Sequence, residues 1–190
     1  MKSLKIFFAM VLMAALAGCV DSEIYETRIN FQKVGTPALI TLQFENISST
    51  ATDSTETKKD FEQLVQDWKS DKYLKDQAKR GFDIKNRELF VRDSKITGRI
   101  TLTTKNLDGQ FHFSVMNGER IMVLDGLAQP GRLETNGKVL KTEKNTLIVW
   151  PENAKEIYWK ESGRLSEAFR KNQPVVFKLL KDYLASQSNR

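Results

Sequence analysis

Few side chains in the sequence could carry out nucleophilic or acid–base chemistry, because it contains one histidine and one cysteine. The histidine, His112, stands between Phe111 and Phe113, so a strand that buries both rings would place it on the opposite face. A catalytic histidine needs a nucleophile and an orienting acid beside it, and no G-x-S-x-G motif surrounds the nearby Ser114. We therefore expect His112 to lie on the solvent-facing side of a strand.

Paired carboxylates offer a second kind of chemistry. Two acidic groups about 5 to 10 Å apart suffice for the cleavage of a glycosidic bond. The residues that could supply such a pair are Asp93, Asp108, Glu119, Asp125 and Glu134. Asp108 and Asp125 each precede a glycine, which is typical of turns. Turn and surface roles are therefore favoured for these acids, and a carboxylate-dependent hydrolase is kept as an alternative.

Three aromatic residues, Trp150, Tyr158 and Trp159, flank Pro151. Such a group is found both in hydrophobic cores and in grooves that bind ligands or stack against sugar rings. Because consecutive strand residues point to opposite faces, Tyr158 and Trp159 are expected on different faces of a sheet. We predict that these three aromatic residues include a contact for a ligand or partner.

Motifs for nucleotides and metal ions are missing from the sequence. It has no G-x-G-x-x-G or Walker-type glycine loop, no EF-hand spacing of acids and no cluster of histidines. We therefore expect no cofactor and no metal site. Because no catalytic constellation stands out, the sequence favours a protein that is not an enzyme.

The elements that position these residues follow from the hydrophobic pattern of a chain whose composition, 40% hydrophobic and 28% charged, is that of a globular protein. Apolar and polar residues alternate with the period of two of half-buried strands. The segments with strand character are 24–31, 38–44, 82–92, 96–104, 111–115, 121–123, 132–135, 138–142, 146–150 and 156–159. Two Asn-Gly pairs, beginning at Asn117 and at Asn136, predict hairpins with type I′ turns.

Two further regions show the spacing of helices. Apolar residues from Phe61 to Trp68 fall on one face of a helix. An interruption at Ser70 separates it from a second helix, which Gly81 ends. A C-terminal helix is predicted to begin at 172–174, with a proline in its first turn. The sequence therefore predicts an α+β fold: mainly an antiparallel β-sheet meander with an inserted helical pair and a C-terminal helix.

The N-terminal segment has the pattern of an export signal. Two lysines give a basic start, and an apolar run covers residues 6–17. The run is shorter than the ~20 residues that a permanent transmembrane helix needs. It ends in Leu16-Ala17-Gly18-Cys19, which resembles the lipobox of bacterial lipoproteins.

The resemblance implies that Cys19 is lipidated. In bacterial lipoproteins the cysteine sulfur receives a diacylglycerol, the signal is cut before the cysteine, and the new amino group is usually acylated. Val20 rather than an aspartate follows the cysteine, which in enteric-type sorting implies the periplasmic face of the outer membrane more than the inner membrane. We expect residues 1–18 to be the signal peptide, 19–22 the lipidated cysteine with a short tether of about 14 Å, and 23–190 a single envelope domain.

The net charge of the chain and its expected location in the cell envelope limit the classes of partner. The formal net charge of the chain is +6, and it falls to +4 when the signal peptide with its two lysines is removed. Outside the cytoplasm nucleic acid is an implausible partner, whereas the membrane is a partner through the lipid anchor. The favoured function is a non-catalytic binding or assembly module, held close to the membrane, for an envelope protein, lipid or glycan. The alternatives are a lipid or lipoprotein carrier with a half-barrel cavity, and a hydrolase acting on an envelope glycan.

Overall fold

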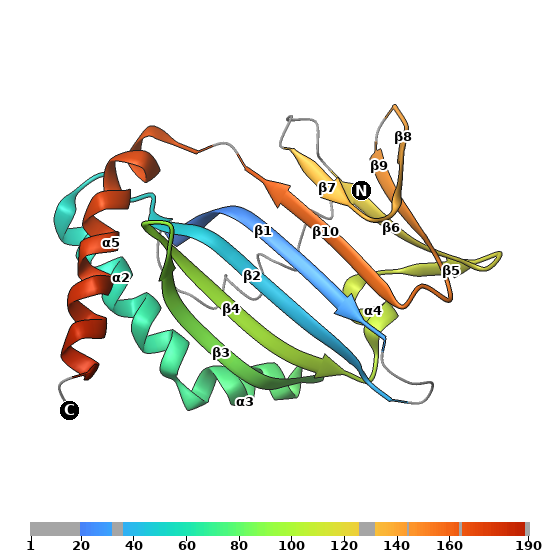
Figure 1. The fold of residues 1–190 in the computed structure, drawn as a ribbon, viewed down its shortest axis with the longest axis horizontal. Coiled ribbons are helices and arrows are strands. Elements are labelled where there is room, and N and C mark those ends of the chain that lie inside the picture. The colour runs from blue at the N-terminus through green and yellow to red at the C-terminus, as the bar shows by residue number, and fades with distance from the viewer. Residues whose placement is uncertain (1–19, 32–35, 126–131, 144, 164, 189–190) are drawn as a thin grey trace.

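A computed structural model gives the fold of the chain and describes residues 20–31, 36–125, 132–143, 145–163 and 165–188 (Figure 1). Within these ranges the chain forms ten strands in two antiparallel sheets and four helices. The helices are α2 (Ser54–Lys69), α3 (Asp71–Lys79), α4 (Leu107–Phe111) and α5 (Glu167–Ser188). The predicted α+β class, with mainly antiparallel strands and a C-terminal helix, is confirmed.

The strands divide into a larger sheet A and a smaller sheet B. In spatial order sheet A contains β3 (Phe82–Arg92), β4 (Lys95–Thr104), β2 (Ala38–Ser49), β1 (Val20–Asn30), β10 (Glu156–Ser162) and β7 (Leu133–Thr135). Sheet B contains β5 (Ser114–Met116), β6 (Glu119–Asp125), β9 (Asn145–Pro151) and β8 (Lys138–Lys141). Because β10 returns to pair with β1, and β9 with β6, the strands do not follow chain order as they would in one continuous meander.

β1 begins immediately after the expected lipidation position. Val20 already pairs with Ser49 of β2, and the hydroxyl of Ser22 donates a hydrogen bond to the carbonyl oxygen of Glu45 at 2.7 Å. Ser22 is only 4% exposed. Residues 20–22 therefore belong to the sheet, and this part of the tether expected over 19–22 is corrected, whereas Cys19 lies outside the described residues. The sequence pattern missed them because their polar side chains interrupt the apolar alternation.

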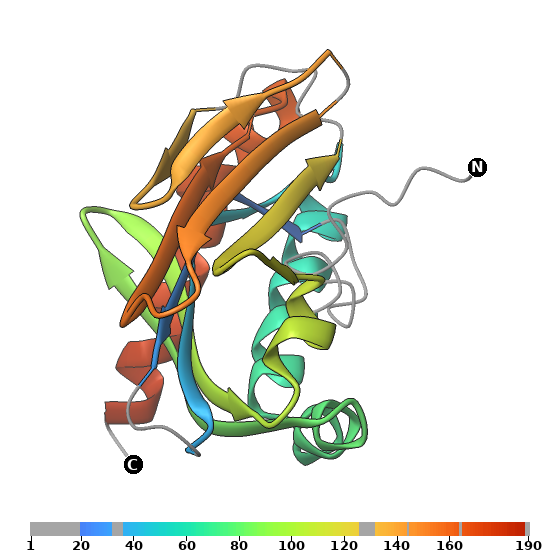
Figure 2. The same ribbon diagram turned by 90° about the vertical axis from the view of Figure 1, so that its right-hand side faces the viewer.

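The helical pair predicted between the strands is present, and α2 and α3 lie on one side of sheet A (Figure 2). The carboxylate of Asp53 accepts hydrogen bonds from two backbone N–H groups in the first turn of α2, and Ser70 separates the helices as predicted. Trp68 of α2 packs on Gly98 of β4, where an added Cβ would come within 2.5 Å of the indole ring. This glycine therefore allows the close approach of α2 to the sheet.

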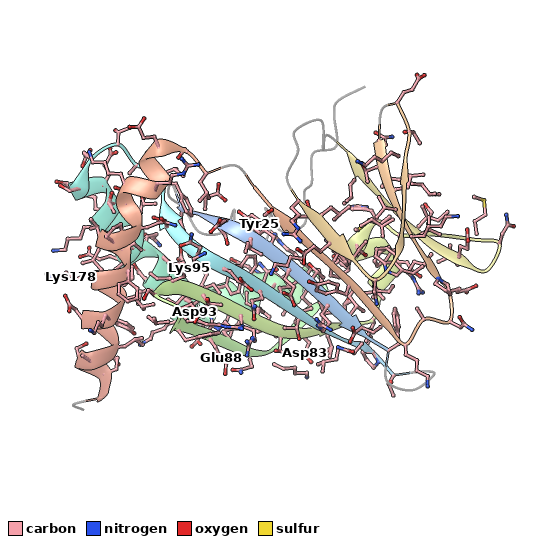
Figure 3. The ribbon with its side chains drawn as sticks, turned by 45° about the horizontal axis from the view of Figure 1, so that its top comes forward. Tyr25, Asp83, Glu88, Asp93, Lys95 and Lys178 are labelled. Atoms are coloured by element: carbon pink, nitrogen blue, oxygen red, sulfur yellow. The ribbon has the colours of Figure 1, made fainter. Side chains whose placement is uncertain are left out.

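A tight turn joins β3 to β4 at the end of sheet A that adjoins α5. Asp93 and Ser94 form it with φ angles of 50° and 60°. After the turn, Lys95 pairs with Glu23 of β1 at 3.3 Å. Figure 3 shows Asp93 and Lys95 near α5, with Asp83 at the other end of β3. Asp83 and Asp93 therefore mark the two opposite ends of sheet A along β3.

Of the two predicted Asn-Gly hairpins, the one at Asn117 is confirmed, since Asn117 and Gly118 have φ angles of 54° and 77° between β5 and β6. The hairpin predicted at Asn136 is wrong, because β7 before it belongs to sheet A and β8 after it belongs to sheet B. The side-chain oxygen of Asn136 accepts hydrogen bonds from Trp150 Nε1 at 2.8 Å and from the Tyr158 backbone N–H at 2.9 Å. Asn136 therefore fixes the crossing between the sheets.

The strand predicted over 111–115 is wrong in its first half. Asn106 begins α4, and its side-chain oxygen accepts a hydrogen bond from the Gly109 backbone N–H at 3.1 Å. The helix ends at His112, whose φ of 53° lies in the left-handed region that commonly ends helices. β5 therefore starts only two residues later, although the phenylalanines on either side of His112 are both buried.

α5 begins at Glu167, earlier than the predicted 172–174, so the proline lies inside the helix. The hydroxyl of Ser166 accepts a hydrogen bond from the Phe169 backbone N–H at 3.1 Å and caps the first turn. Asn172 is 6% exposed, and its amide nitrogen donates to two backbone carbonyls at the end of β2 and just beyond it. These contacts place α5 across the end of sheet A at which β1 begins (Figure 1).

Candidate functional site

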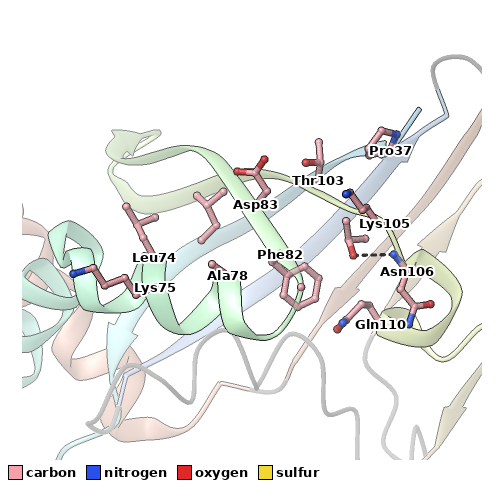
Figure 4. A pocket seen from close by; sticks show the side chains of 13 residues that line it. Pro37, Leu74, Lys75, Ala78, Phe82, Asp83, Thr103, Lys105, Asn106 and Gln110 are labelled. Atoms are coloured by element: carbon pink, nitrogen blue, oxygen red, sulfur yellow. Dashed lines mark hydrogen bonds between the residues drawn. The ribbon is translucent and has the colours of Figure 1, made fainter. Parts of the chain in front are cut away.

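A pocket of about 650 Å³ opens at the opposite end of sheet A. α3 forms one wall, and the remainder comes from the first residues of β3, the last residues of β4 and the region of α4 (Figure 4). This is the end at which β1 finishes, because β2, which begins next to the lining residue Pro37, pairs with the last residue of β1. Cavities of this size are typical of small-molecule sites.

The wall that α3 and β3 form is apolar. Leu74 and Ala78, about one helical turn apart on α3, line the pocket together with Ile84 of β3. Phe82, the first residue of β3, also lines the pocket and is only 3% exposed. Burying such a surface against an apolar group removes both surfaces from water, which favours a ligand with an apolar part.

The rim near α4 is polar and positively charged. Lys105 and Asn106 are neighbours just after β4, and Lys75 lies on the α3 side (Figure 4). Asp83 is paired with Lys85, so its charge is compensated. Neither Lys75 nor Lys105 forms an ion pair within the ranges that the structure describes. The rim therefore carries two uncompensated positive charges.

Asn106 is oriented by the helix that it begins. Its Oδ1 accepts the hydrogen bond from Gly109, and a Cβ on Gly109 would come within 2.5 Å of Asn106 Nδ2. Gln110 of the same helix donates from Nε2 to the carbonyl oxygen of Arg80 at 2.6 Å. This hydrogen bond connects α4 to the end of α3, so the two sides of the pocket are held together.

A partly buried polar contact connects the start of α3 to β3. Arg87 of β3 donates to the carbonyl oxygen of Ser70 at 3.1 Å, and its guanidinium lies 5.8 Å from the centre of the Tyr73 ring. Burial raises the pKa of the Tyr73 hydroxyl, so this group stays neutral. One extra residue in β3, Lys85, shifts the pairing with β4 and produces a bulge beside the pocket.

The three aromatic residues singled out in the sequence do not lie in this pocket. Trp150 and Trp159 are 1% and 7% exposed, and their rings are 6.1 Å apart in a core cluster with Phe111 and Phe113. Tyr158 lies on the opposite face of β10 to Trp159, as predicted, with the Arg28 guanidinium 4.7 Å from its ring centre. The two tryptophans therefore act as core residues, and only Tyr158 keeps a partly exposed surface.

The candidate acids at the two ends of β4 are too far apart to act together. Asp93 lies in the turn before β4 and Asp108 in the helix after it. β4 has ten residues, so its ends lie about 30 Å apart at ~3.3 Å per step along the strand. A glycosidase pair needs a separation of about 5 to 10 Å, so these two acids cannot form one.

Two of the candidate acids are engaged by arginine. Asp108 accepts a hydrogen bond from Nε of the buried Arg120 at 2.9 Å, and Glu134 lies 3.1 Å from Arg132. Glu119 is exposed at the start of β6, and the side chain of Asp125 lies outside the described residues. The contacts with arginine give Asp108 and Glu134 structural roles.

The single histidine is not among the residues that line the pocket. His112 is exposed at the end of α4, and Cys19 lies outside the described residues. In the ranges that the structure describes, no group of three or more histidine, cysteine or acidic residues could hold a metal ion. No helix in the same ranges is long and apolar enough to span a membrane.

Sequence reasoning missed the residues that form this pocket. Lys105 and Asn106 look like the end of a strand, and nothing in the sequence places them beside Leu74 and Ala78. The only usable indication is Asn106 three residues before a glycine, which is a helix-capping position.

Searches of protein-family models, of curated proteins and of solved structures find no match to the chain.

Proposed function

We propose that the chain is a lipid-anchored, non-catalytic binding module of the bacterial cell envelope. The resemblance of Leu16-Ala17-Gly18-Cys19 to a lipobox supports the anchor, and Val20 supports the periplasmic face of the outer membrane. The pocket beside α3 supports binding as the activity. The membrane is then a partner through the lipid, and the molecule in the pocket is a second partner.

The position of the pocket relative to the anchor is the observation that carries this proposal. β1 has eleven residues and spans about 33 Å. It begins next to Cys19 and finishes at the end of sheet A where the pocket opens. An acylated Cys19 would therefore hold the domain at the headgroups by one end and present the pocket about 33 Å along the sheet. With β1 starting at Val20, little free tether remains to change that orientation.

The lining of the pocket supports binding better than catalysis. Among the lining residues that the structure describes, the single acid, Asp83, is paired with Lys85, and there is no histidine, cysteine or serine. An acid–base or nucleophilic mechanism needs a group that is free to accept a proton or attack a substrate. The apolar wall and charged rim instead provide affinity and orientation for a bound molecule.

A lipid carrier is the second candidate, because the same apolar wall could receive an acyl chain. This pocket lies at the end of sheet A, unlike the half-barrel cavity expected from the sequence. A carrier differs from the binding module proposed above because it must exchange its ligand with a membrane or another protein. Transfer of a bound molecule to acceptor vesicles would favour the carrier.

Two measurements in cells test the proposal. Cys19→Ala should move the chain from the membrane fraction to the soluble fraction, and full membrane retention of this variant would refute lipid anchorage. A photo-crosslinking amino acid in place of Ala78 should give a ligand adduct, whereas the same substitution at Ala185, an exposed position on α5, should give none. Equal adducts at both positions would refute the pocket as the binding site.

A further inference from the structure

We infer that the pocket takes a small anionic amphiphile, a molecule with one carboxylate or phosphate group and a single apolar chain. This inference rests on the proposed function, because it names the ligand class of the same pocket. It comes from the combination of an apolar wall with a rim whose two lysines form no ion pair with any acid in the described part of the chain.

The rim supplies the anion-binding part of the site. Lys105 and Asn106 lie side by side, and the lysine ammonium and the asparagine amide can both donate hydrogen bonds to a carboxylate or phosphate oxygen. Lys75 adds a second positive charge on the α3 side. Asp83 is the only acid among the described lining residues, and its pairing with Lys85 weakens the repulsion that it exerts on an anion.

The α3 wall supplies the apolar part. Leu74 and Ala78 follow each other along the helix axis over about 6 Å, so an extended alkyl chain can run along this wall from the charged rim. Each additional methylene that becomes buried should raise the affinity about fourfold. The chain length and the head group therefore make separable contributions to the affinity.

Other ligand classes fit the lining less well. A cation has no free carboxylate to bind, because Asp83 is already paired. A glycan favours exposed aromatic rings and many hydrogen-bonding groups, but Phe82, the only aromatic residue among the lining residues in the described ranges, is 3% exposed. An anionic amphiphile is the class whose two parts both find complementary surfaces in this pocket.

Isothermal titration calorimetry on the lipidated full chain in phosphatidylcholine nanodiscs tests the assignment, with empty nanodiscs as the blank. The probes are octanoate, octyl phosphate, 1-octanol and acetate, which vary the head group and the chain separately. Octanoate or octyl phosphate should bind at least about tenfold more tightly than 1-octanol, and acetate should not saturate a site. The tighter of the two anions identifies the head group as carboxylate or phosphate. Raising the salt concentration should weaken the binding of the anions but not that of octanol.

Substitutions in and near the pocket test whether the probes bind there. Lys105→Gln should lower the affinity for octanoate about tenfold, close to that for octanol. Lys72→Gln, on α3 but outside this pocket, should leave the affinity for octanoate within about twofold. Ala78→Trp should abolish binding by filling the pocket.

Three results would overturn the inference: equal binding of octanoate and octanol, no effect of Lys105→Gln, or unchanged octanoate binding in Ala78→Trp. The proposed function can be judged separately by photo-crosslinking from position 78. An adduct there, together with no binding of the anionic probes, would reject the ligand class and keep the binding module. If neither an adduct nor probe binding is found, both proposals fail.

Discussion

The indole Nε1 of Trp150 donates a hydrogen bond to Oδ1 of Asn136 at 2.8 Å. Trp150 lies on β9 of sheet B and is 1% exposed, whereas Asn136 lies between β7 of sheet A and β8 of sheet B. The same oxygen also accepts from the backbone of β10. One side chain therefore connects the two sheets at the point where the chain crosses between them.

Loss of this connection should destabilise the fold. Asn136→Ala should lower the free energy of unfolding by about 1–3 kcal/mol, because the buried indole N–H loses its acceptor. Trp150→Phe removes that N–H, so in the double variant the cost of Asn136→Ala should become smaller. Urea unfolding of the two single variants and the double variant measures this coupling. Strictly additive losses would show that the hydrogen bond does not join the sheets energetically.

The contact between α2 and sheet A makes Gly98 sensitive to substitution. Gly98→Ala would place a methyl group 2.5 Å from the Trp68 ring and should cost about 1–3 kcal/mol of stability. Gly163→Ala is the matched control, because an added Cβ there has no neighbour within 4 Å, and its effect should stay within about 0.5 kcal/mol. Thermal or urea unfolding of both variants compares them. Equal effects would contradict the tight packing of Trp68 on β4.

Stability should fall with rising pH through the titration of Glu161. Burial raises the pKa of this carboxyl above its ordinary value of 4.5, and the hydrogen bond from Trp159 offsets only part of the rise. The folded state therefore holds the proton more tightly, so the stability contribution is complete below pH 4.5 and is lost as pH rises through the folded pKa. Glu161→Gln should flatten this dependence and make the variant relatively more stable at neutral pH.

Urea unfolding between pH 4 and about 8 provides the measurement. Glu62→Gln, on α2 where the side chain is 62% exposed, serves as the control and should keep the pH dependence of the unsubstituted chain. An unchanged profile in Glu161→Gln would show that this carboxyl titrates alike in the folded and unfolded states.

The start of β1 fixes where a longer tether can be inserted. About 20 Gly and Ser residues between Cys19 and Val20 would add about 25 Å of root-mean-square span and should leave the free energy of unfolding within about 0.5 kcal/mol. The same insertion after Ser22 would separate the paired residues from the rest of β1 and should cost about 1–3 kcal/mol. If both insertions were equally harmless, the first residues of β1 would be a tether after all.

Local patterns predicted most elements of this fold. The alternation over β2, the interruption at Ser70 and the turn at Asn117 were read correctly because each depends on residues that are neighbours in sequence. The crossing at Asn136 was misread because an Asn-Gly pair indicates only a sharp turn. Its direction is decided by Trp150 and Tyr158, which are distant in sequence.

The candidate site was less accessible to sequence reasoning. Aromatic residues drew attention to Trp150 and Trp159, but a tryptophan is as useful in a core as in a groove, and only the packing of two sheets decides between them. The pocket combines Leu74 with Lys105 through the docking of α3 beside the β3–β4 hairpin. No local sequence pattern could predict this arrangement, because the residues are distant in sequence. The lipobox could be found because its residues are consecutive.

Native mass spectrometry of the lipidated chain, extracted from membranes in a mild detergent, detects the anchor and the bound molecule in one experiment. We expect acyl groups on Cys19 together with a small non-covalent ligand. Ala78→Trp should lose the ligand and keep the acyl groups, while Ala185→Trp should keep both. An unmodified Cys19, or a ligand that remains bound in Ala78→Trp, would contradict an anchored module whose pocket lies beside α3.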